Sequence, residues 1–208
     1  MKDLLALARF SVAGLKMMVA ATLLLGVAYP LAVTGVAHLA LPWHAEGSLL
    51  TAAGAHTDST DDAVGSALIG QAVTGPRAAG LFLPRPSAAG DGYDALASAG
   101  SNLGPESPDL EQAIRDRRAE VAKREGVDPA AVPPDALTAS ASGLDPQISP
   151  AYAALQVPRV AQASGLSQEQ VRALVQRHTS GRTWGTLGEP RVDVLRLNID
   201  VLQAERGR

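Results

Sequence analysis

Residue types that bind metals or act as nucleophiles are poorly placed for chemistry in this chain. Cysteine is absent, which excludes a thiolate zinc site and a cysteine nucleophile. The histidines form no HExxH motif or paired metal spacing, and no serine lies in a GxSxG motif. We therefore predict no metal site and no catalytic residue. The four histidines are His38, His44, His56 and His178.

Two carboxylates flank a loop of small residues, TASASGLDP, at 138–146. Asp135 precedes the loop and Asp145 lies within it, so the pair could act as general acid and base. Asp145 stands directly before Pro146, however, and aspartate at such positions usually accepts backbone N–H groups in a turn. We therefore favour the turn and keep acid–base catalysis as the alternative.

Two further sets of residues could bind an anion. The small-residue segment Ser98–Asn102, SAGSN, could surround a phosphate. It lacks the GxxxxGK[ST] motif of P-loops, so an ordinary turn is the stronger interpretation. Four arginines could clamp an anion if the fold brought them together. They are Arg85, Arg159, Arg182 and Arg191.

A stretch of 25 residues without Asp, Glu, Lys or Arg, at 17–41, precedes these loops. As a helix it measures about 37 Å, more than a hydrocarbon core of about 30 Å. A buried core helix would be shorter. A signal peptide would have a shorter apolar core and a cleavage site of small residues, whereas the sequence PWH follows at 42–44. We predict a retained transmembrane helix that starts between residues 12 and 17.

The basic residues near this span lie on one side of it. Lys2, Arg9 and Lys16 precede the span, whereas no lysine or arginine occurs from Pro42 to Pro76. The positive-inside rule therefore predicts that the N-terminus is cytoplasmic. The predicted segments are a cytoplasmic part with the helix start at 1–16, the span at 17–41 and an extracytoplasmic domain at 42–208.

Small residues mark one face of the span, at Ala28, Ala32 and Gly35. They could let a partner helix approach closely, and exposure to the lipid bilayer is the alternative. After the span the chain is acidic and its arginines are scattered among Asp and Glu, which argues against a nucleic-acid partner.

The domain after the span is predicted to be α+β, mostly helical with a small sheet. Its elements follow from local signals for strands, caps and turns. We predict a loop at 45–60, strands at 67–69, 81–83 and 192–199, a helix from Ser107 to Gly126, one from Ser149 that Pro158 kinks or splits, and one with a capping box of Ser167 and Gln170.

Six short motifs occur in order along the chain: GSALIGQ (65–71), RPSA (85–88), GSNLGP (100–105), TASASGLDP (138–146), ISPAYA (148–153) and LGEPRVDVLRLN (187–198). Behind one N-terminal span, they resemble the C subunit of the Kdp potassium-transporting P-type ATPases, the KdpC family, over nearly the whole chain. Three positions depart from the family pattern. Ala99 replaces a usual glycine, Gln147 replaces a usual histidine, and Pro158 falls inside an expected helix.

The resemblance implies a non-catalytic accessory subunit of a complex that imports K⁺ using ATP. Its partners would be a channel-like A subunit and an ATP-hydrolysing B subunit. The family is commonly described as a catalytic chaperone that raises the affinity of the B subunit for ATP. The resemblance implies no intrinsic cofactor, with ATP bound only through the complex. The residues it implies for nucleotide contact are Ser98, Gly100, Ser101 and Asn102.

The chaperone description conflicts with the predicted topology, because a domain outside the membrane cannot reach cytoplasmic ATP. We therefore expect the domain to dock on the outer face of the channel-like subunit and to stabilise the assembly or the K⁺ entrance. Arg85 and Asp145 are the expected contacts in the domain. A membrane-tethered extracytoplasmic enzyme that acts on lipid or cell wall is the alternative function.

Overall fold

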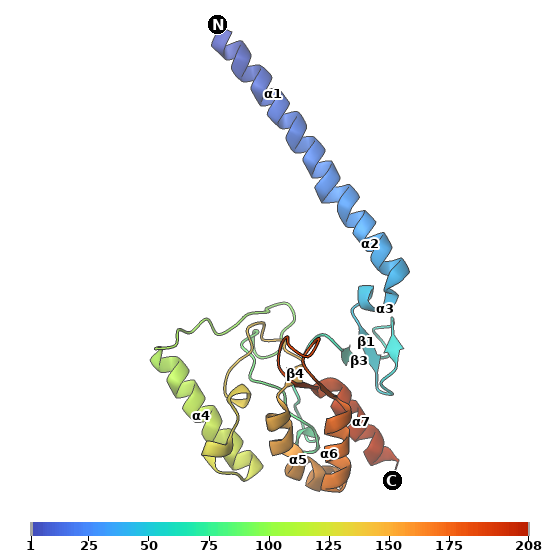
Figure 1. The fold of residues 1–208 in the computed structure, drawn as a ribbon, viewed down its shortest axis with the longest axis vertical. Helices are drawn as coiled ribbons and strands as arrows, with labels where there is room; N and C mark the ends of the chain where they lie inside the picture. The colour runs from blue at the N-terminus through green and yellow to red at the C-terminus, as the bar shows by residue number, and fades with distance from the viewer. Residues whose placement is uncertain (1, 208) are drawn as a thin grey trace. The chain divides into compact units, whose positions relative to one another are not determined.

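The computed structural model describes residues 2–207. The chain divides into two compact units, Met1–Ser48 and Leu49–Arg208 (Figure 1). The second unit is α+β with small sheets, which confirms the predicted fold class.

The first unit is one long apolar helical stretch followed by a short helix. Residues Leu4–Ala40 are long and apolar enough to cross a membrane. The helix begins at Lys2, earlier than predicted, because the leucine- and alanine-rich sequence before residue 12 contains no helix breaker. Its elements are α1 (Lys2–Leu23), the π-helical turn η1 (Leu24–Ala28), α2 (Tyr29–Ala40) and α3 (Pro42–Ala45).

The π-helical turn lies directly before Pro30. Proline has no N–H and its ring clashes with the preceding turn of an α-helix. The wider turn absorbs this mismatch, and the Tyr29 N–H donates to the Leu24 carbonyl five residues back. The apolar stretch therefore stays helical through its proline.

Two antiparallel three-stranded sheets lie in the second unit, with the orders β2-β1-β3 and β4-β6-β5. The predicted loop at 45–60 is wrong, because β1 and β2 lie inside it. The predicted strand at 67–69 is also wrong. There the Ser66 hydroxyl accepts the Leu68 N–H and turns the chain. The strands are β1 (Leu49–Thr51), β2 (His56–Thr57), β3 (Ala63–Ser66), β4 (Gln147–Ile148), β5 (Thr179–Ser180) and β6 (Arg191–Asp193).

The helices of the second unit begin and end mostly where local signals predict. Ser149 caps its helix, Ser167 and Gln170 form the predicted capping box, and Gly126 ends its helix with a φ of 68°. The long helices are α4 (Pro108–Glu125), α5 (Pro150–Ser164), α6 (Gln168–Arg177) and α7 (Val194–Arg206), and the short 3₁₀ turns are η2 (Ala78–Gly80), η3 (Pro129–Ala131) and η4 (Pro134–Ala136).

The structure differs from two predictions in the second unit, one for a helix and one for a strand. Helix α5 is not split, because Pro158 and Ala154 are both exposed and the carbonyl that Pro158 leaves unbonded can face water. The predicted strand at 192–199 ends at Asp193. The Asp193 side chain accepts the Arg196 N–H at 3.0 Å and so caps α7. Burial raises the pKa of this carboxyl group.

Helix α5 is the centre of the core, and α6 and α7 pack beside it (Figure 1). Glu125, at the end of α4, has a fully buried side chain that binds Arg159 of α5 at 2.9 Å. Arg159 also donates to the carbonyl oxygens of Ala79 and Leu81. The core residues include Phe82, Val121, Ile148, Val157, Val160, Val171, Val192, Leu197 and Val201.

The predicted strand at 81–83 is an extended segment that belongs to neither sheet. Two buried side-chain amides bind its backbone. Asn198 of α7 accepts the Phe82 N–H at 2.7 Å and donates to the Phe82 carbonyl at 2.9 Å. Gln156 of α5 binds both backbone groups of Leu83 in the same way, at 2.7 and 3.1 Å. These side chains replace a neighbouring strand.

Replacing Gln156 by leucine is expected to lower the free energy of unfolding by roughly 2–4 kcal/mol, because it leaves the two partly buried Leu83 backbone groups without these partners. Thermal or denaturant unfolding of the full chain in a neutral detergent measures this. Gln112→Leu is the matched control, since Gln112 is exposed on α4, and it should change stability by less than about 0.5 kcal/mol. Equal effects of the two changes would show that the amide bonds contribute nothing.

Candidate functional site

The loop at 138–146 is the point where two other sequence motifs, GSALIGQ and RPSA, meet the segment that contains Ser98. Segments far apart in the chain each form a hydrogen bond with its backbone, so the loop fixes their relative positions. The bonds run from Gly70 N–H to Leu144 O, from Ser140 N–H to Pro86 O, from Ser87 Oγ to Gly143 O and from Ser98 Oγ to Ser142 O, at 2.8, 3.3, 2.6 and 2.9 Å.

Gly143 is the tightest point of this loop. Its φ of 68° is left-handed, which other residues rarely adopt. A Cβ atom there would lie 2.7 Å from the Ala89 nitrogen and 2.7 Å from the Ala99 carbonyl oxygen. Only glycine fits between these two segments.

The two loop carboxylates serve the backbone. Asp135 accepts the N–H and the hydroxyl of Ser149, both at 2.8 Å. Asp145 accepts the Gln147 N–H at 2.9 Å and pairs with Arg85 at 3.2 Å. The contacts support the turn interpretation of these residues over acid–base catalysis.

Tyr93 completes the support of the segment that contains Arg85. Its φ is 60°, a left-handed conformation that costs energy for a tyrosine. Its hydroxyl donates to the Arg85 carbonyl at 2.6 Å, and its N–H donates to the Ser87 hydroxyl at 2.9 Å. Burial raises the pKa of the Tyr93 phenol far above its ordinary value, so it remains a neutral donor.

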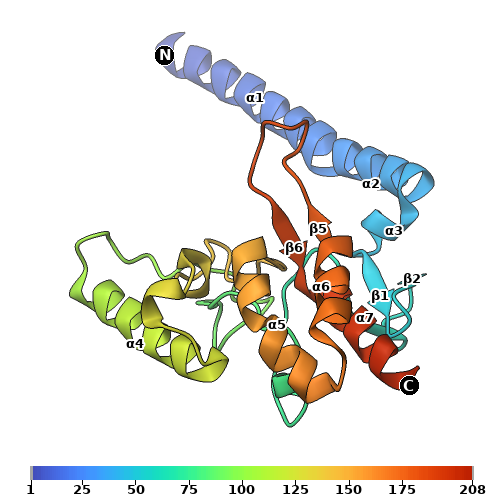
Figure 2. The same ribbon diagram turned by 60° about the horizontal axis from the view of Figure 1, so that its bottom comes forward.

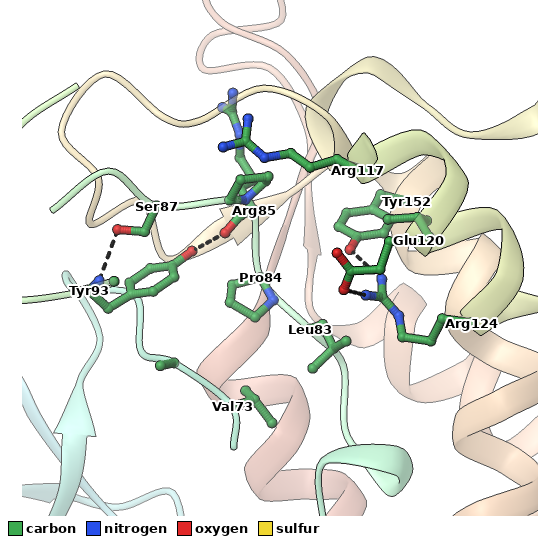
Figure 3. A pocket seen from close by; sticks show the side chains of 15 residues that line it. Val73, Leu83, Pro84, Arg85, Ser87, Tyr93, Arg117, Glu120, Arg124 and Tyr152 are labelled. Atoms are coloured by element: carbon green, nitrogen blue, oxygen red, sulfur yellow. Dashed lines mark hydrogen bonds and ion pairs between the residues drawn. The ribbon is translucent and has the colours of Figure 1, made fainter. Parts of the chain in front are cut away.

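A cavity of about 310 Å³ lies beside these groups, between the 84–87 segment and α4 (Figure 3). Arginine is the most frequent charged residue in its lining. Arg117 donates to the Leu137 carbonyl at 3.0 Å, and Arg124 donates to the Tyr152 hydroxyl at 3.0 Å. Glu120 lies 3.7 Å from Arg124. The cavity can therefore attract an anion through its arginines.

The predicted arginine clamp does not form as a group. Arg159 is bound to Glu125, and Arg182 pairs with Glu189 at 2.8 Å on an exposed hairpin. Arg191 donates to the Gly181 carbonyl. Of the four arginines, Arg85 alone lines the cavity, where its neighbour is Arg117. The sequence does not distinguish Arg117 from the other charged residues of α4.

The residues implied for nucleotide contact lie apart from this cavity. Ser98 is bonded to the 138–146 loop, and Gly100 packs against the Ala141 carbonyl. Ser101 and Asn102 are exposed. Nucleotide contact at these positions stays a prediction. Ala28, Ala32 and Gly35 are exposed along the apolar helix, and their contact with a partner also stays a prediction.

A hairpin at 181–190 projects from strands β5 and β6 (Figure 2). Its tip is apolar, with Trp184 87% and Leu187 55% exposed. Thr183 and Leu187 exchange two backbone hydrogen bonds at 2.8 and 3.0 Å, which close the tip of the hairpin. Trp184 has a φ of 53°, so the fold holds a large aromatic residue in a strained conformation while exposing it. Sequence patterns alone did not single out this tryptophan.

Comparison with known proteins gives consistent matches over most of the chain. Residues 11–203 match the family model described as KdpC, the c chain of a K⁺-transporting ATPase. The potassium-transporting ATPase KdpC subunit of Kineococcus radiotolerans is 52% identical over 191 residues, which cover 92% of each chain. The protein of the same name from Beijerinckia indica is 48% identical over 86% of this chain and 85% of its own. That from Mycobacterium tuberculosis is 49% identical over 89% and 93%.

Replacing Gly143 by alanine is expected to lower the free energy of unfolding by roughly 2–4 kcal/mol, through left-handed strain and the clash with two backbone segments. Unfolding of the full chain in a neutral detergent measures this. Gly104→Ala is the control, because nothing lies within 4 Å of a Cβ atom at Gly104. A loss of less than about 0.5 kcal/mol at Gly143 would show that the loop does not constrain its neighbours.

Proposed function

The chain belongs to the KdpC family, the C chains of K⁺-transporting ATPases, and from this premise we propose that it is a non-catalytic subunit that docks on its partners outside the membrane. The exposed tip of the 181–190 hairpin, closed by two backbone hydrogen bonds, is the observation that supports docking. Tryptophan is enriched among the residues that dominate the energy of protein interfaces. A preformed tip loses little conformational freedom on binding.

The charge pattern around the apolar helix supports the proposed side of the membrane. Basic residues precede the helix, and none occurs in the first 35 residues after Leu41. On the outer side the domain would contact the channel-like subunit, stabilise the assembly or the K⁺ entrance, and favour cations slightly through its acidic balance. The ATP-hydrolysing subunit would keep its nucleotide domain in the cytoplasm.

The role as a catalytic chaperone that raises ATP affinity requires the opposite side of the membrane. The tethered-enzyme alternative needs free catalytic groups, and the contacts do not favour it. Asp135 binds Ser149, the residue that caps α5, and Asp145 pairs with Arg85. Docking on partner subunits is therefore the function that the contacts support best.

Alkaline phosphatase fused after Arg208 is expected to be active in cells, and a green fluorescent protein at the same position is expected to stay dark. The reason is the basic flank, which holds the N-terminus in the cytoplasm. The same reporters fused directly after Lys16, before the span, should give the reverse pattern. A C-terminal reporter that works only in the cytoplasm would contradict the proposal and favour the ATP-affinity role.

Replacing Trp184 by alanine is expected to reduce recovery of the other subunits with the tagged chain at least tenfold, because an interface tryptophan contributes about 2 kcal/mol or more. Co-purification of ATPase activity from membranes in a neutral detergent measures this. Leu96→Ala is the control, since Leu96 is 98% exposed on a different loop. Equal recovery with both variants would exclude the hairpin as the docking element.

A further inference from the structure

Two guanidinium groups from different elements converge on one wall of the arginine-lined cavity. Arg117 of α4 donates to the Leu137 carbonyl at 3.0 Å, and Arg85 donates to the carbonyl of the next residue, Thr138, at 3.3 Å. Successive carbonyl groups therefore hold both cations on the same short segment. Figure 3 shows both side chains at the cavity. Like charges held on neighbouring carbonyl groups repel each other, and Asp145 offsets only the charge of Arg85.

The carboxylates around the cavity pair with Arg85 and Arg124 and leave the charge of Arg117 without a carboxylate partner in residues 2–207. Asp145 binds Arg85 through one oxygen, at 3.2 Å, and Glu120 lies beside Arg124. Among the residues that the structure describes, Arg117 forms no ion pair with a carboxylate. Arg117 is half-buried, so water screens its charge only in part.

One donor of Arg85 has no acceptor. Its Nε atom is buried and makes no hydrogen bond within the described part of the chain, although its terminal nitrogens bind Asp145 and Thr138. A buried N–H without a partner costs free energy, so the Arg85 side chain is not fully bonded within the described part of the chain. The charge of Arg117, which no carboxylate of the described residues pairs with, is what calls for an oxyanion in the cavity.

We propose that the cavity binds a phosphate group between Arg85 and Arg117. Guanidinium groups form paired, charge-assisted hydrogen bonds with phosphate oxygens, and Arg117 supplies a charge that no carboxylate in the described chain pairs with. The volume of about 310 Å³ holds a phosphate group with several waters. Free phosphate and the headgroup of an anionic phospholipid supply the same chemistry. The proposal does not depend on docking by the hairpin.

The test is titration of the full chain, in a neutral detergent, with inorganic phosphate at constant ionic strength set by chloride. Thermal unfolding and ³¹P line broadening give the affinity. Arg117→Gln is expected to weaken binding at least tenfold. Arg115→Gln on the same helix removes the same charge from an exposed position outside the cavity, and should leave the affinity within twofold. Arg117→Lys keeps the charge and should weaken binding by an intermediate factor.

Short-chain phosphatidylglycerol, with phosphatidylcholine as the neutral control, distinguishes the two sources of the phosphate group. Competition by phosphatidylglycerol that Arg117→Gln abolishes identifies a lipid headgroup, and saturation by inorganic phosphate alone identifies the free ion. Both results support the site. Equal weakening by Arg115→Gln and Arg117→Gln, or no effect of either phosphate source beyond that of chloride, would overturn it.

Discussion

The second unit depends on the burial of one extended segment, residues 81–83, without a neighbouring strand. Buried backbone groups need partners, and here Gln156 and Asn198 supply them from two different helices. The two amides fix α5 and α7 against the segment. Arg159, one turn along α5 from Gln156, binds the buried Glu125 and so joins α4 to the same centre. The chain that leaves this segment forms one wall of the cavity.

Local signals predicted the helices of the second unit well because caps and glycine stops act within a few residues. Local signals gave wrong predictions where contacts between distant parts of the chain determine the secondary structure. An apolar run such as 81–83 has strand character, but only the folded chain shows that side-chain amides replace its neighbours. At 192–199 the alternation of apolar residues competed with the capping preference of Asp193, and the cap prevailed.

The candidate site shows the same division. The motifs were visible in the sequence, and the turn interpretation of Asp135 and Asp145 agrees with their contacts. The convergence of the motifs on the 138–146 loop depends on the close packing at Gly143, which no local pattern reveals. Arg117 lies among other charged residues of a solvated helix face, so the sequence alone could not separate it from its neighbours.

The polar groups of the second unit divide into those that the fold uses fully and those that keep binding capacity. The hydroxyls of Ser87 and Ser98 bind loop carbonyls, and Asp135 uses both its oxygens on a helix start. Arg117 donates to the Leu137 carbonyl and Trp184 is exposed, so both side chains keep capacity to bind a partner, and they lie on separate elements. Catalysis needs several groups directed at one reacting atom, whereas recognition needs separate contact points on rigid supports. The arrangement therefore suits recognition at separate contact points.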